Sequence, residues 1–423
     1  MRLNYIINYI NNYIIKYIII TSLILCFNNL KAQSSLYAYQ DIAAMNNPGI
    51  QALFKQYEVV MQKVPQSSAL PDPTIGFGYF INSVETRVGP QQAVLSVSQS
   101  FPWFGELGAK EQAATERANA VLERFNNERS KLNFDVAATY YSLYVLRSAI
   151  KVNEEHIVLL NTFKNLAKVR FESGQGSMVD VLRIDMELGE LNNQLQYLED
   201  SKQPIVARFE QLLNTKFSEE INLPEVLWSD ELDAEKGLIK DSVEMTNPSI
   251  LSLEHQLLSY DKDVISARKT GGPSFTVGMN YTFVGEREGY TGSDNGKDAI
   301  LPVIGIKIPL YRKKYNARIK EAELFRESVA LKKVDKTNEL AAGLENGFRD
   351  YDDAVRRVIL YHKLIIYAQQ AMDLLLSEYS STQTNFEELI RMNRKLLNYE
   401  LELEKSRADQ NTSVAYINYL MGK

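Results

Sequence analysis

Residue types that build most catalytic and metal sites are scarce in this chain. Its 423 residues include one cysteine and three histidines, and His156, His255 and His362 lie far apart in the sequence. Structural and catalytic metals are usually held by clusters of such residues. We therefore predict no enzyme activity, no metal site and no cofactor. His156 and His362 occupy similar places in two long helical segments, and we expect them on a surface or in a helix seam.

Long apolar runs are also rare. Two bases precede an apolar run at residues 17–27, and Ala32 offers a small residue for cleavage, so residues 1–32 are predicted to be a signal peptide. The run is shorter than the ~20 residues that span a bilayer. A retained membrane anchor is one alternative. A lipid anchor on Cys26 is another, although the bulky neighbours of this cysteine fit such processing poorly.

Positive charge is not in excess. The formal net charge is −6, and loss of residues 1–32 would remove three bases and no acids, which leaves −9. We therefore predict no nucleic-acid partner. No later segment approaches the ~18 consecutive apolar residues expected of a transmembrane helix. An exported chain of this kind is either soluble or placed in a membrane by strands.

What the sequence does contain is a duplicated pattern. Four positions recur at an offset of 200 residues: Met45, Asn47, Pro48 and Ile50 return as Met245, Asn247, Pro248 and Ile250. Further along, the offset is 208: Leu132, Val136 and Tyr140 return as Leu340, Leu344 and Phe348. The second copy therefore carries a short insertion, which we place in the glycine-rich stretch 285–298, where extra residues cost little. The chain is predicted to be two copies of one unit.

Each copy contains a predicted strand hairpin, at about 74–101 and about 274–310, in which apolar residues alternate with small or polar ones. Strands with one apolar face need a second sheet or lipid to cover it, and the chain supplies no further strands. Four strands cannot close into a barrel, and an open edge in lipid leaves costly unpaired backbone groups. Several copies of the chain must therefore share one barrel.

Long helical segments accompany the hairpins. The first repeat, 33–213, is predicted to hold a short helix from Ile42 to Val64 capped by Asp41, a long helix at about 106–171, a tip at 173–177 and a helix at 178–213. A connector at 214–246 follows. The second repeat, 247–423, is predicted to hold a short helix at 248–269, a long helix at about 316–380, a tip at 381–385 and a helix at 386–420. Apolar residues spaced alternately three and four apart after each tip indicate coiled-coil packing.

The order and spacing of these features resemble the outer membrane efflux proteins, the TolC-like channels. The matching residues are Asn47-Pro48, Asn247-Pro248, Pro102, Pro309, the tip from Gly174 to Leu182, and the closing Tyr419-Leu420-Met421-Gly422. The resemblance implies a mainly α-helical homotrimer with a membrane β-barrel portion. Four strands per chain would form a shared 12-strand barrel in the outer membrane of a Gram-negative bacterium, continued by a periplasmic α-helical barrel.

The same resemblance implies a passive exit duct for efflux. Its partners would be outer membrane lipid, a periplasmic adaptor protein and an inner-membrane pump of RND or ABC type. A soluble periplasmic adaptor or scaffold built from helical hairpins is the alternative function. It explains the export signal and the heptads but not the four amphipathic strands. The sequence does not distinguish a drug, a metal ion, a peptide or a protein as the transported substrate.

The resemblance also indicates site residues. Asp180 and Glu388 follow the two tips at equivalent positions, where acidic side chains line the closed periplasmic mouth in this family. Arg183 and Arg391 stand where the family often has a second acid, and salt bridges across the mouth would hold it shut. The alternative for both acids is a favourable place in the first turn of a helix.

The two tips are predicted to contact the adaptor, although a tight turn between helices would also explain their composition. They are Gly174, Gln175, Gly176 and Ser177 in the first repeat and Thr382, Gln383, Thr384 and Asn385 in the second. Aromatic residues near the strand ends are expected to form an interfacial belt, with ordinary strand packing as the alternative. They are Tyr79, Phe80, Phe101, Trp103, Tyr281, Phe283 and Tyr311.

Overall fold

The structure is a computed structural model that describes residues 35–217, 221–381 and 386–423. The predicted signal peptide at 1–32 and the tip residues 382–385 lie outside the described residues. The chain divides into two compact units, and each unit draws on both repeats. The first, here called the sheet unit, comprises Leu53–Phe125 and Pro248–Thr337. The second, the tip unit, comprises Met1–Ala52, Asn126–Asn247 and Asn338–Lys423.

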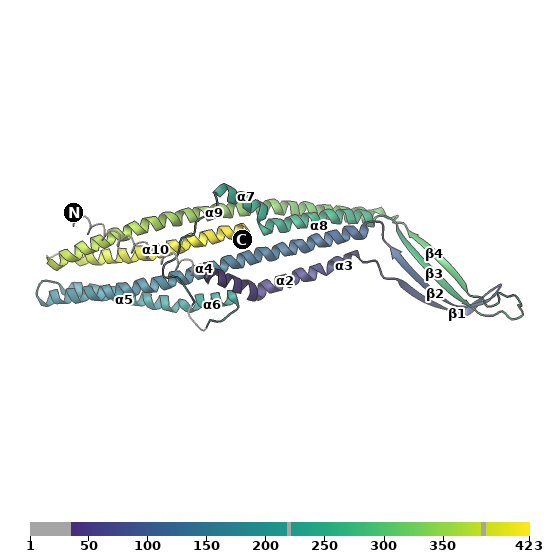
Figure 1. Ribbon diagram of the computed structural model, residues 1–423, viewed down its shortest axis with the longest axis horizontal. Helices are drawn as coiled ribbons and strands as arrows, with labels where there is room; N and C mark the ends of the chain where they lie inside the picture. The colour runs from purple at the N-terminus through teal and green to yellow at the C-terminus, as the bar shows by residue number, and fades with distance from the viewer. Residues whose placement is uncertain (1–34, 218–220, 382–385) are drawn as a thin grey trace, which may run out of the picture. The chain divides into compact units, whose positions relative to one another are not determined.

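In the first repeat the chain forms two hairpins, one of strands and one of helices (Figure 1). A helix over residues 35–46 comes first. The further elements are α2 (Pro48–Met61), α3 (Lys63–Ser68), β1 (Thr74–Thr86), β2 (Gly89–Phe101), α4 (Glu106–Glu172), α5 (Met178–Asp200) and α6 (Lys202–Leu213).

The second repeat follows a connector and has the same general order. Its elements are α7 (Lys236–Thr246), α8 (Pro248–Thr270), β3 (Ser274–Val284), β4 (Ala299–Lys307), α9 (Arg312–Ser381) and α10 (Phe386–Leu420). Helix α7 lies inside the predicted connector 214–246, where no helix was expected. None of the described helices contains a stretch that is both apolar and long enough to span a bilayer.

The predicted start of the first helix was wrong. The chain is already helical at residue 35, so Asp41 lies inside a helix, and the helical path is interrupted at Asn47. The side-chain oxygen of Asn47 accepts hydrogen bonds from the backbone N–H groups of Gly49 (2.9 Å) and Ile50 (3.2 Å). Asn47 therefore caps α2 directly before Pro48, and proline is well tolerated in the first turn of a helix.

The predicted single helix at 178–213 was also wrong, because α5 and α6 are separated at Ser201. Pro204 lies in the first turn of α6 and has no backbone N–H to donate to a carbonyl of the preceding turn, so it favours a new helix start there. At the same place in the second repeat, 208 residues later, stands Thr412, and α10 runs without a break. One proline accounts for this difference between the repeats.

The four strands form one antiparallel sheet in the order β1-β2-β3-β4 (Figure 1). Directly paired residues project from the same face of a sheet. The register aligns the apolar residues of all four strands, as in the row that runs from Phe77 through Leu95 and Tyr281 to Ile300. The prediction of a mainly helical chain with four amphipathic strands is confirmed.

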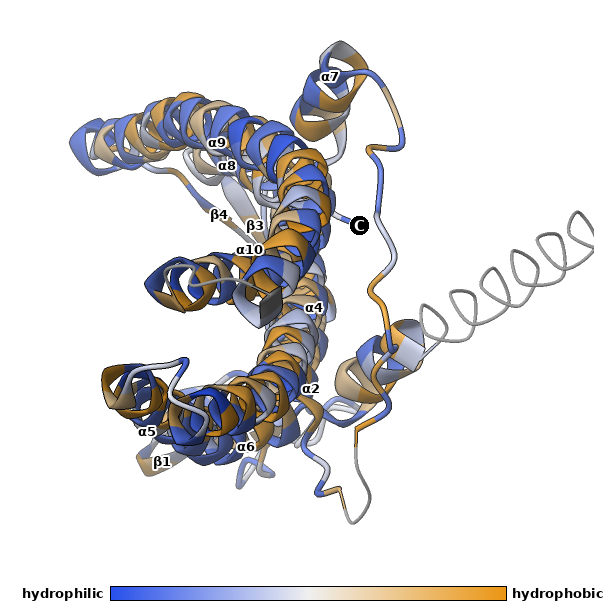
Figure 2. Ribbon diagram, turned by 90° about the vertical axis from the view of Figure 1, so that its left-hand side faces the viewer, coloured by the Kyte–Doolittle hydropathy of each residue, from blue (hydrophilic) through white to orange (hydrophobic). Residues whose placement is uncertain are grey.

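The tip unit has a buried apolar core shared by α4, α5, α9 and α10. Its members include Phe163 and Leu160 from α4, Ile184 from α5 and Leu389 from α10, which are each 0 or 1% exposed. Hydropathy colours in Figure 2 show that the long helices carry hydrophobic and hydrophilic residues together, and none is hydrophobic all round. The two helical hairpins therefore pack against each other through apolar stripes, as heptad spacing requires.

Candidate functional site

The apolar face of the sheet is exposed. Ile75 is 70% exposed, Phe77 and Tyr79 are each 71% exposed, and Ile304 is 77% exposed. The opposite face carries mainly small or polar residues, such as Ser96, Gly278 and Thr276. A contiguous apolar surface of this kind marks contact with lipid or with another protein. The four strands of the sheet are 9 to 13 residues long, a length that suits strands crossing a membrane at a tilt.

Strands β1 and β4 form the two edges of this sheet, because among the described strands each pairs with one neighbour only. An unpaired strand edge presents a row of free backbone donors and acceptors, and in lipid each such group costs several kcal/mol. The sheet therefore needs further strands along both edges before it suits a bilayer.

The predicted mouth residues of the first repeat lie at the start of α5. Ser177 is the N-cap, and its hydroxyl accepts a hydrogen bond from the backbone N–H of Val179 (3.1 Å). Asp180 follows in the first turn, where a carboxylate is favoured by the helix dipole. Its charge also faces Tyr379 of α9, whose pKa is raised mainly by burial and then by Asp180. Arg170 of α4 lies over the ring of Tyr379, 4.6 Å from its centroid.

The two arginines predicted at the mouth make two different kinds of ion pair. Arg183 of α5 pairs with Glu387 of α10 at 3.3 Å, and so connects the two repeats. Arg391 pairs with Glu388 one turn earlier in the same helix, and this carboxylate raises the pKa of Arg391. In the described chain Arg183 is therefore joined to Glu387 and not to Asp180.

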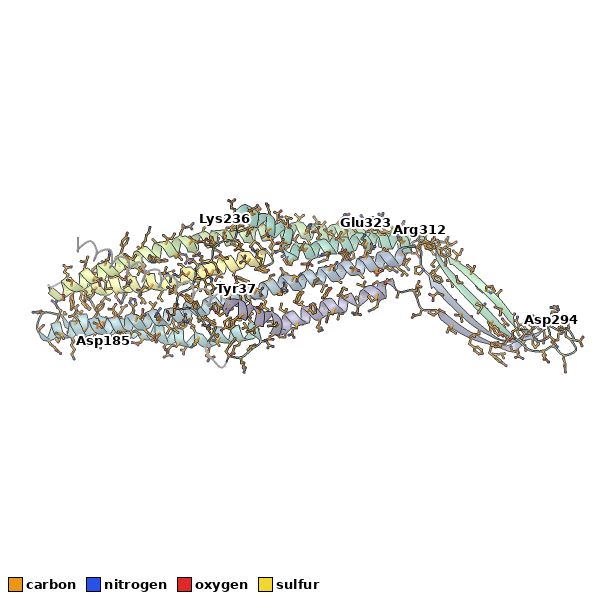
Figure 3. All side chains as sticks on the ribbon, in the orientation of Figure 1. Tyr37, Asp185, Lys236, Asp294, Arg312 and Glu323 are labelled. Atoms are coloured by element: carbon orange, nitrogen blue, oxygen red, sulfur yellow. The ribbon has the colours of Figure 1, made fainter. Side chains whose placement is uncertain are left out.

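Two further ion pairs, which the sequence did not predict, lie between the two helical hairpins and within the first of them. Glu187 of α5 is 7% exposed and accepts a hydrogen bond of 2.6 Å from Arg394 of α10. Lys164 of α4 pairs with Asp185 of α5 at 2.6 Å, and Figure 3 labels Asp185 near the end of the hairpin. The sequence did contain one sign of the contact between Glu187 and Arg394, because Glu187 is an acid inside the apolar stripe of α5.

The first tip is a tight turn between α4 and α5. Gly174 has a φ of 74°, which favours glycine, and the backbone N–H of Gln175 donates to the carbonyl of Arg170 (2.8 Å). A Cβ on Gly176 would lie 3.0 Å from Cβ of Arg170, so this position is closely packed. Gln175 is exposed, and so is Ser177. The corresponding residues of the second tip, Thr382, Gln383, Thr384 and Asn385, lie outside the described residues.

The histidines occupy a seam and the surface. His156 is 3% exposed and lies between α4 and α10, with Nδ1 3.0 Å from Oδ1 of Asn393 and Nε2 2.7 Å from Glu400. His362 is exposed. His255 lies 2.7 Å from a carboxylate oxygen of Glu116. No group of three or more metal-ligating side chains occurs among the described residues.

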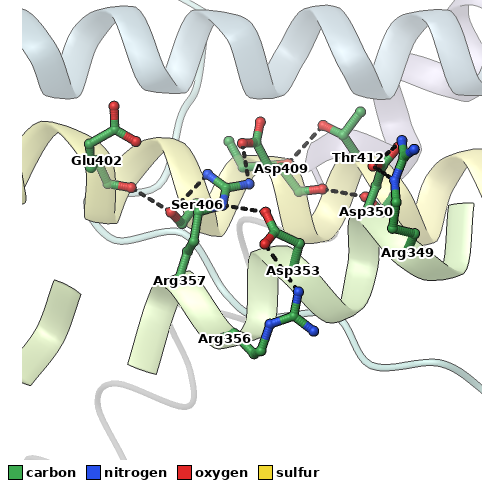
Figure 4. A network of polar contacts seen from close by, with 11 residues as sticks. Arg349, Asp350, Asp353, Arg356, Arg357, Glu402, Ser406, Asp409 and Thr412 are labelled. Carbon is green, nitrogen blue, oxygen red and sulfur yellow. Dashed lines mark hydrogen bonds and ion pairs between the residues drawn. The ribbon is translucent and has the colours of Figure 1, made fainter. Parts of the chain in front are cut away.

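A second polar network joins α9 to α10 (Figure 4). Arg357 of α9 donates to Asp353 of its own helix (2.8 Å), to Ser406 of α10 (3.2 Å) and to Asp409 of α10 (2.9 Å). The pKa of Asp353 is lowered, mainly by its hydrogen bond with Arg357. The charged residues of this network lie on α9 and α10 only, so they stabilise the second helical hairpin.

The connector packs against α4 and α10. Asn411 of α10 donates to the carbonyl of Trp228 (2.9 Å) and accepts from the backbone N–H of Asp230 (2.9 Å). Burial raises the pKa of Asp230, although Trp228 donates a hydrogen bond to it. A hollow of about 540 Å³ lies beside this contact, and Tyr37, labelled in Figure 3, is among its lining residues.

Comparison with known proteins agrees with this architecture. The family model described as "Outer membrane efflux protein" matches residues 40–215. The solved structure of CusC covers 92% of this chain and 92% of its own, with a TM-score of 0.77 and 12% identity. Over residues 40–215 the chain is thus similar to the outer membrane efflux protein family. Among curated proteins, no match was found.

Two further outer membrane proteins of known structure share the fold. The outer membrane protein VceC from Vibrio cholerae has a TM-score of 0.75 and 14% identity, and the match covers 93% of this chain and 98% of VceC. The MtrE outer membrane channel of Neisseria gonorrhoeae, in its open state, has a TM-score of 0.74 and 16% identity, with 92% and 88% of the two chains covered. At these identities the likeness shows a shared fold.

Proposed function

We propose that this protein is the outer membrane exit duct of an efflux system and conducts substrates passively out of the cell. The observation that carries the proposal is the sheet, which exposes one continuous apolar face and places small or polar residues on the other. This division suits a wall with lipid on one side and water on the other. A soluble helical adaptor or scaffold would have no use for such a sheet.

The open edges β1 and β4 require a shared barrel. Three copies would contribute twelve strands, and a barrel of that size is wider than an eight-stranded one, whose interior is nearly filled by side chains. The small residues Gly76, Ser98 and Gly278 on the inner face would leave room for water. The long helices would continue this passage through the periplasm as an α-helical barrel.

The energy for transport would come from partners. An inner-membrane pump of RND or ABC type would supply it, and a periplasmic adaptor protein would contact the tips. The exposed Gln175 and Ser177 beside the tight turn at Gly174 would form part of that contact in the first repeat. Thr382, Gln383, Thr384 and Asn385 would supply the matching contact in the second.

The charged residues after the tips would form the closed periplasmic mouth. Asp180 and Glu388 would contribute negative charge, reduced at Glu388 by its pairing with Arg391. The pair between Arg183 and Glu387 joins the two repeats, and we propose that it opposes opening of the mouth. Cation selectivity would then depend chiefly on Asp180, whose carboxylate has no arginine partner among the ion pairs of the described chain.

Single-channel recording in planar bilayers tests this proposal. Wild-type protein should show low conductance, and Arg183→Ala should raise the open probability severalfold because the tie to Glu387 is lost. Arg349→Ala is a matched control, since Arg349 is an exposed arginine on α9 that, within the described part of the chain, pairs with its neighbour Asp350. Absence of conductance in wild type and in Arg183→Ala, under every voltage and salt condition, would contradict the duct.

A further inference from the structure

Basic side chains gather where the second repeat joins its helices to the sheet. Six of them, here called the basic patch, are Arg268, Lys269, Arg312, Lys313, Lys314 and Arg318. Residues 264–284 and 299–320, which contain all six, include no acidic residue. The first repeat differs at the corresponding helix start, where α4 begins with a buried Glu106 that pairs with Lys110 at 2.7 Å.

Helix formation does not explain these bases. The first turn of a helix favours acids, because the helix dipole is positive there. Helix α9 has no acid in its first turn and instead begins with Arg312, Lys313 and Lys314. The three bases therefore oppose the local preference, and a departure of this kind points to a role outside the helix.

Contacts within the chain use only part of the basic patch. Arg268 reaches Glu323 at 3.4 Å, and Arg312 donates to the carbonyl of Gly271 (2.8 Å). Lys313, Lys314 and Arg318 are exposed, and no side chain in the described part of the protein pairs with any of them. Three cations are thus free to meet an external anion.

The basic patch borders the apolar face of the sheet. Exposed apolar residues beside it include Phe104 (76%), Leu310 (76%) and Tyr311 (88%). Trp103 stacks on Phe275, with ring centroids 5.9 Å apart. Figure 3 labels Arg312 at the point where the helices of the sheet unit meet the strands. Aromatic residues followed by bases are typical of the level at which hydrocarbon gives way to headgroups.

We propose that the basic patch binds the headgroup phosphates of anionic glycerophospholipids in the periplasmic leaflet of the outer membrane. The proposal rests on the proposed membrane position of the sheet, which puts its helix-joined end on the periplasmic side. Clusters of four to eight bases beside a membrane segment attract anionic lipid. Arginine and lysine also make charge-assisted hydrogen bonds with phosphate oxygens. Because the first repeat lacks such bases, the lipid would be bound beside the second repeat only.

Trp103 gives a local reporter, since Trp228 is the only other tryptophan and lies in the tip unit. In a Trp228→Phe background, the protein is reconstituted in vesicles that contain brominated phosphatidylglycerol or brominated phosphatidylethanolamine. Brominated phosphatidylglycerol, the anionic lipid, should quench Trp103 at a much lower mole fraction than brominated phosphatidylethanolamine. Lys313→Gln/Lys314→Gln should reduce this preference by roughly thirtyfold, since each base contributes about a fivefold gain at an anionic surface.

Lys240→Gln/Lys332→Gln is the matched control, because both lysines are exposed on helices outside the patch. It should keep the wild-type preference. Quenching that is equal for the two lipids would overturn the lipid site while leaving the membrane position intact. No quenching by either lipid would instead overturn the membrane position itself. A loss of oligomer stability in Lys313→Gln/Lys314→Gln that is the same in both lipids would assign the bases to contacts between copies and also overturn the proposal.

Discussion

The sheet unit and the tip unit use the same apolar residue types in opposite ways. Phe77 of β1 is 71% exposed, whereas Phe163 of α4 is 1% exposed and lies in the core between the helical hairpins. A phenylalanine in water favours burial by about 1.5–3 kcal/mol, so an exposed row of such residues requires another environment. The difference teaches that the sheet, unlike the core of the tip unit, exposes its apolar residues, as the proposed contact with lipid requires.

The largest expected effect comes from truncating the buried phenylalanine. Phe163→Ala should destabilise the tip unit by about 3–5 kcal/mol, because it removes a large side chain from a packed core. Phe77→Ala should change stability in detergent by less than about 1 kcal/mol, since the side chain is already exposed. Thermal unfolding of the two variants measures both. Equal losses of stability would show that Phe77 also packs in a protein core and would contradict the difference between the sheet and the tip unit.

A charge on the sheet should distinguish its two faces. Leu95 pairs with Phe77 and Tyr281 on the apolar face, and its neighbour Ser96 projects from the other face. Leu95→Arg should weaken insertion into vesicles by roughly 2–4 kcal/mol, as for arginine near the middle of a bilayer. Ser96→Arg should insert nearly as wild type. Refolding into lipid vesicles across a urea series gives both values, and a similar cost for the two variants would mean that neither face contacts lipid.

A smaller effect is expected from pH, because Asp353 and Asp230 of the tip unit should contribute to stability with opposite pH dependence. The lowered pKa of Asp353 means that its stabilising contribution is present above pH 3.8, the ordinary value, and is lost as the pH falls below it. The raised pKa of Asp230 has the opposite consequence: ionisation opposes docking of the connector, and this cost appears as the pH rises above 3.8.

Thermal unfolding across pH, for wild type and for the variants Asp353→Asn and Asp230→Asn, tests these opposite trends. The deficit of Asp353→Asn relative to wild type should shrink below pH 3.8. Any advantage of Asp230→Asn should grow as the pH rises from 3.8. A pH-independent difference for either variant would show that the carboxylate does not titrate with folding.

Much of the fold was predictable because its signals are periodic. The alternation at 75–81 and 275–283 indicated strands, and the offset change from 200 to 208 residues indicated one insertion between two copies. The structure places residues 285–298 between β3 and β4, the loop chosen for that insertion. Such patterns can be read from a sequence because many neighbouring residues contribute to them, whatever distant residues they contact in the folded chain.

Other features depend on single residues or distant contacts, and the sequence did not reveal them. Asn47 ends one helix and caps the next, and Pro204 divides α5 from α6, although either residue is compatible with several local structures. The partner of Arg183 could not be foreseen either, since Glu387 lies 204 positions away on another helix. The two compact units also cut across the repeats, because α4 and α9 each contribute to both.

A barrel shared by three chains would close the open edges of β1 and β4, so the mass of the membrane-extracted particle is its most direct test. Native mass spectrometry of protein extracted from outer membranes in mild detergent should give a particle of three chains that dissociates only on heating. A stable single chain, with the edges of β1 and β4 left open, would contradict the shared barrel and the exit duct built on it.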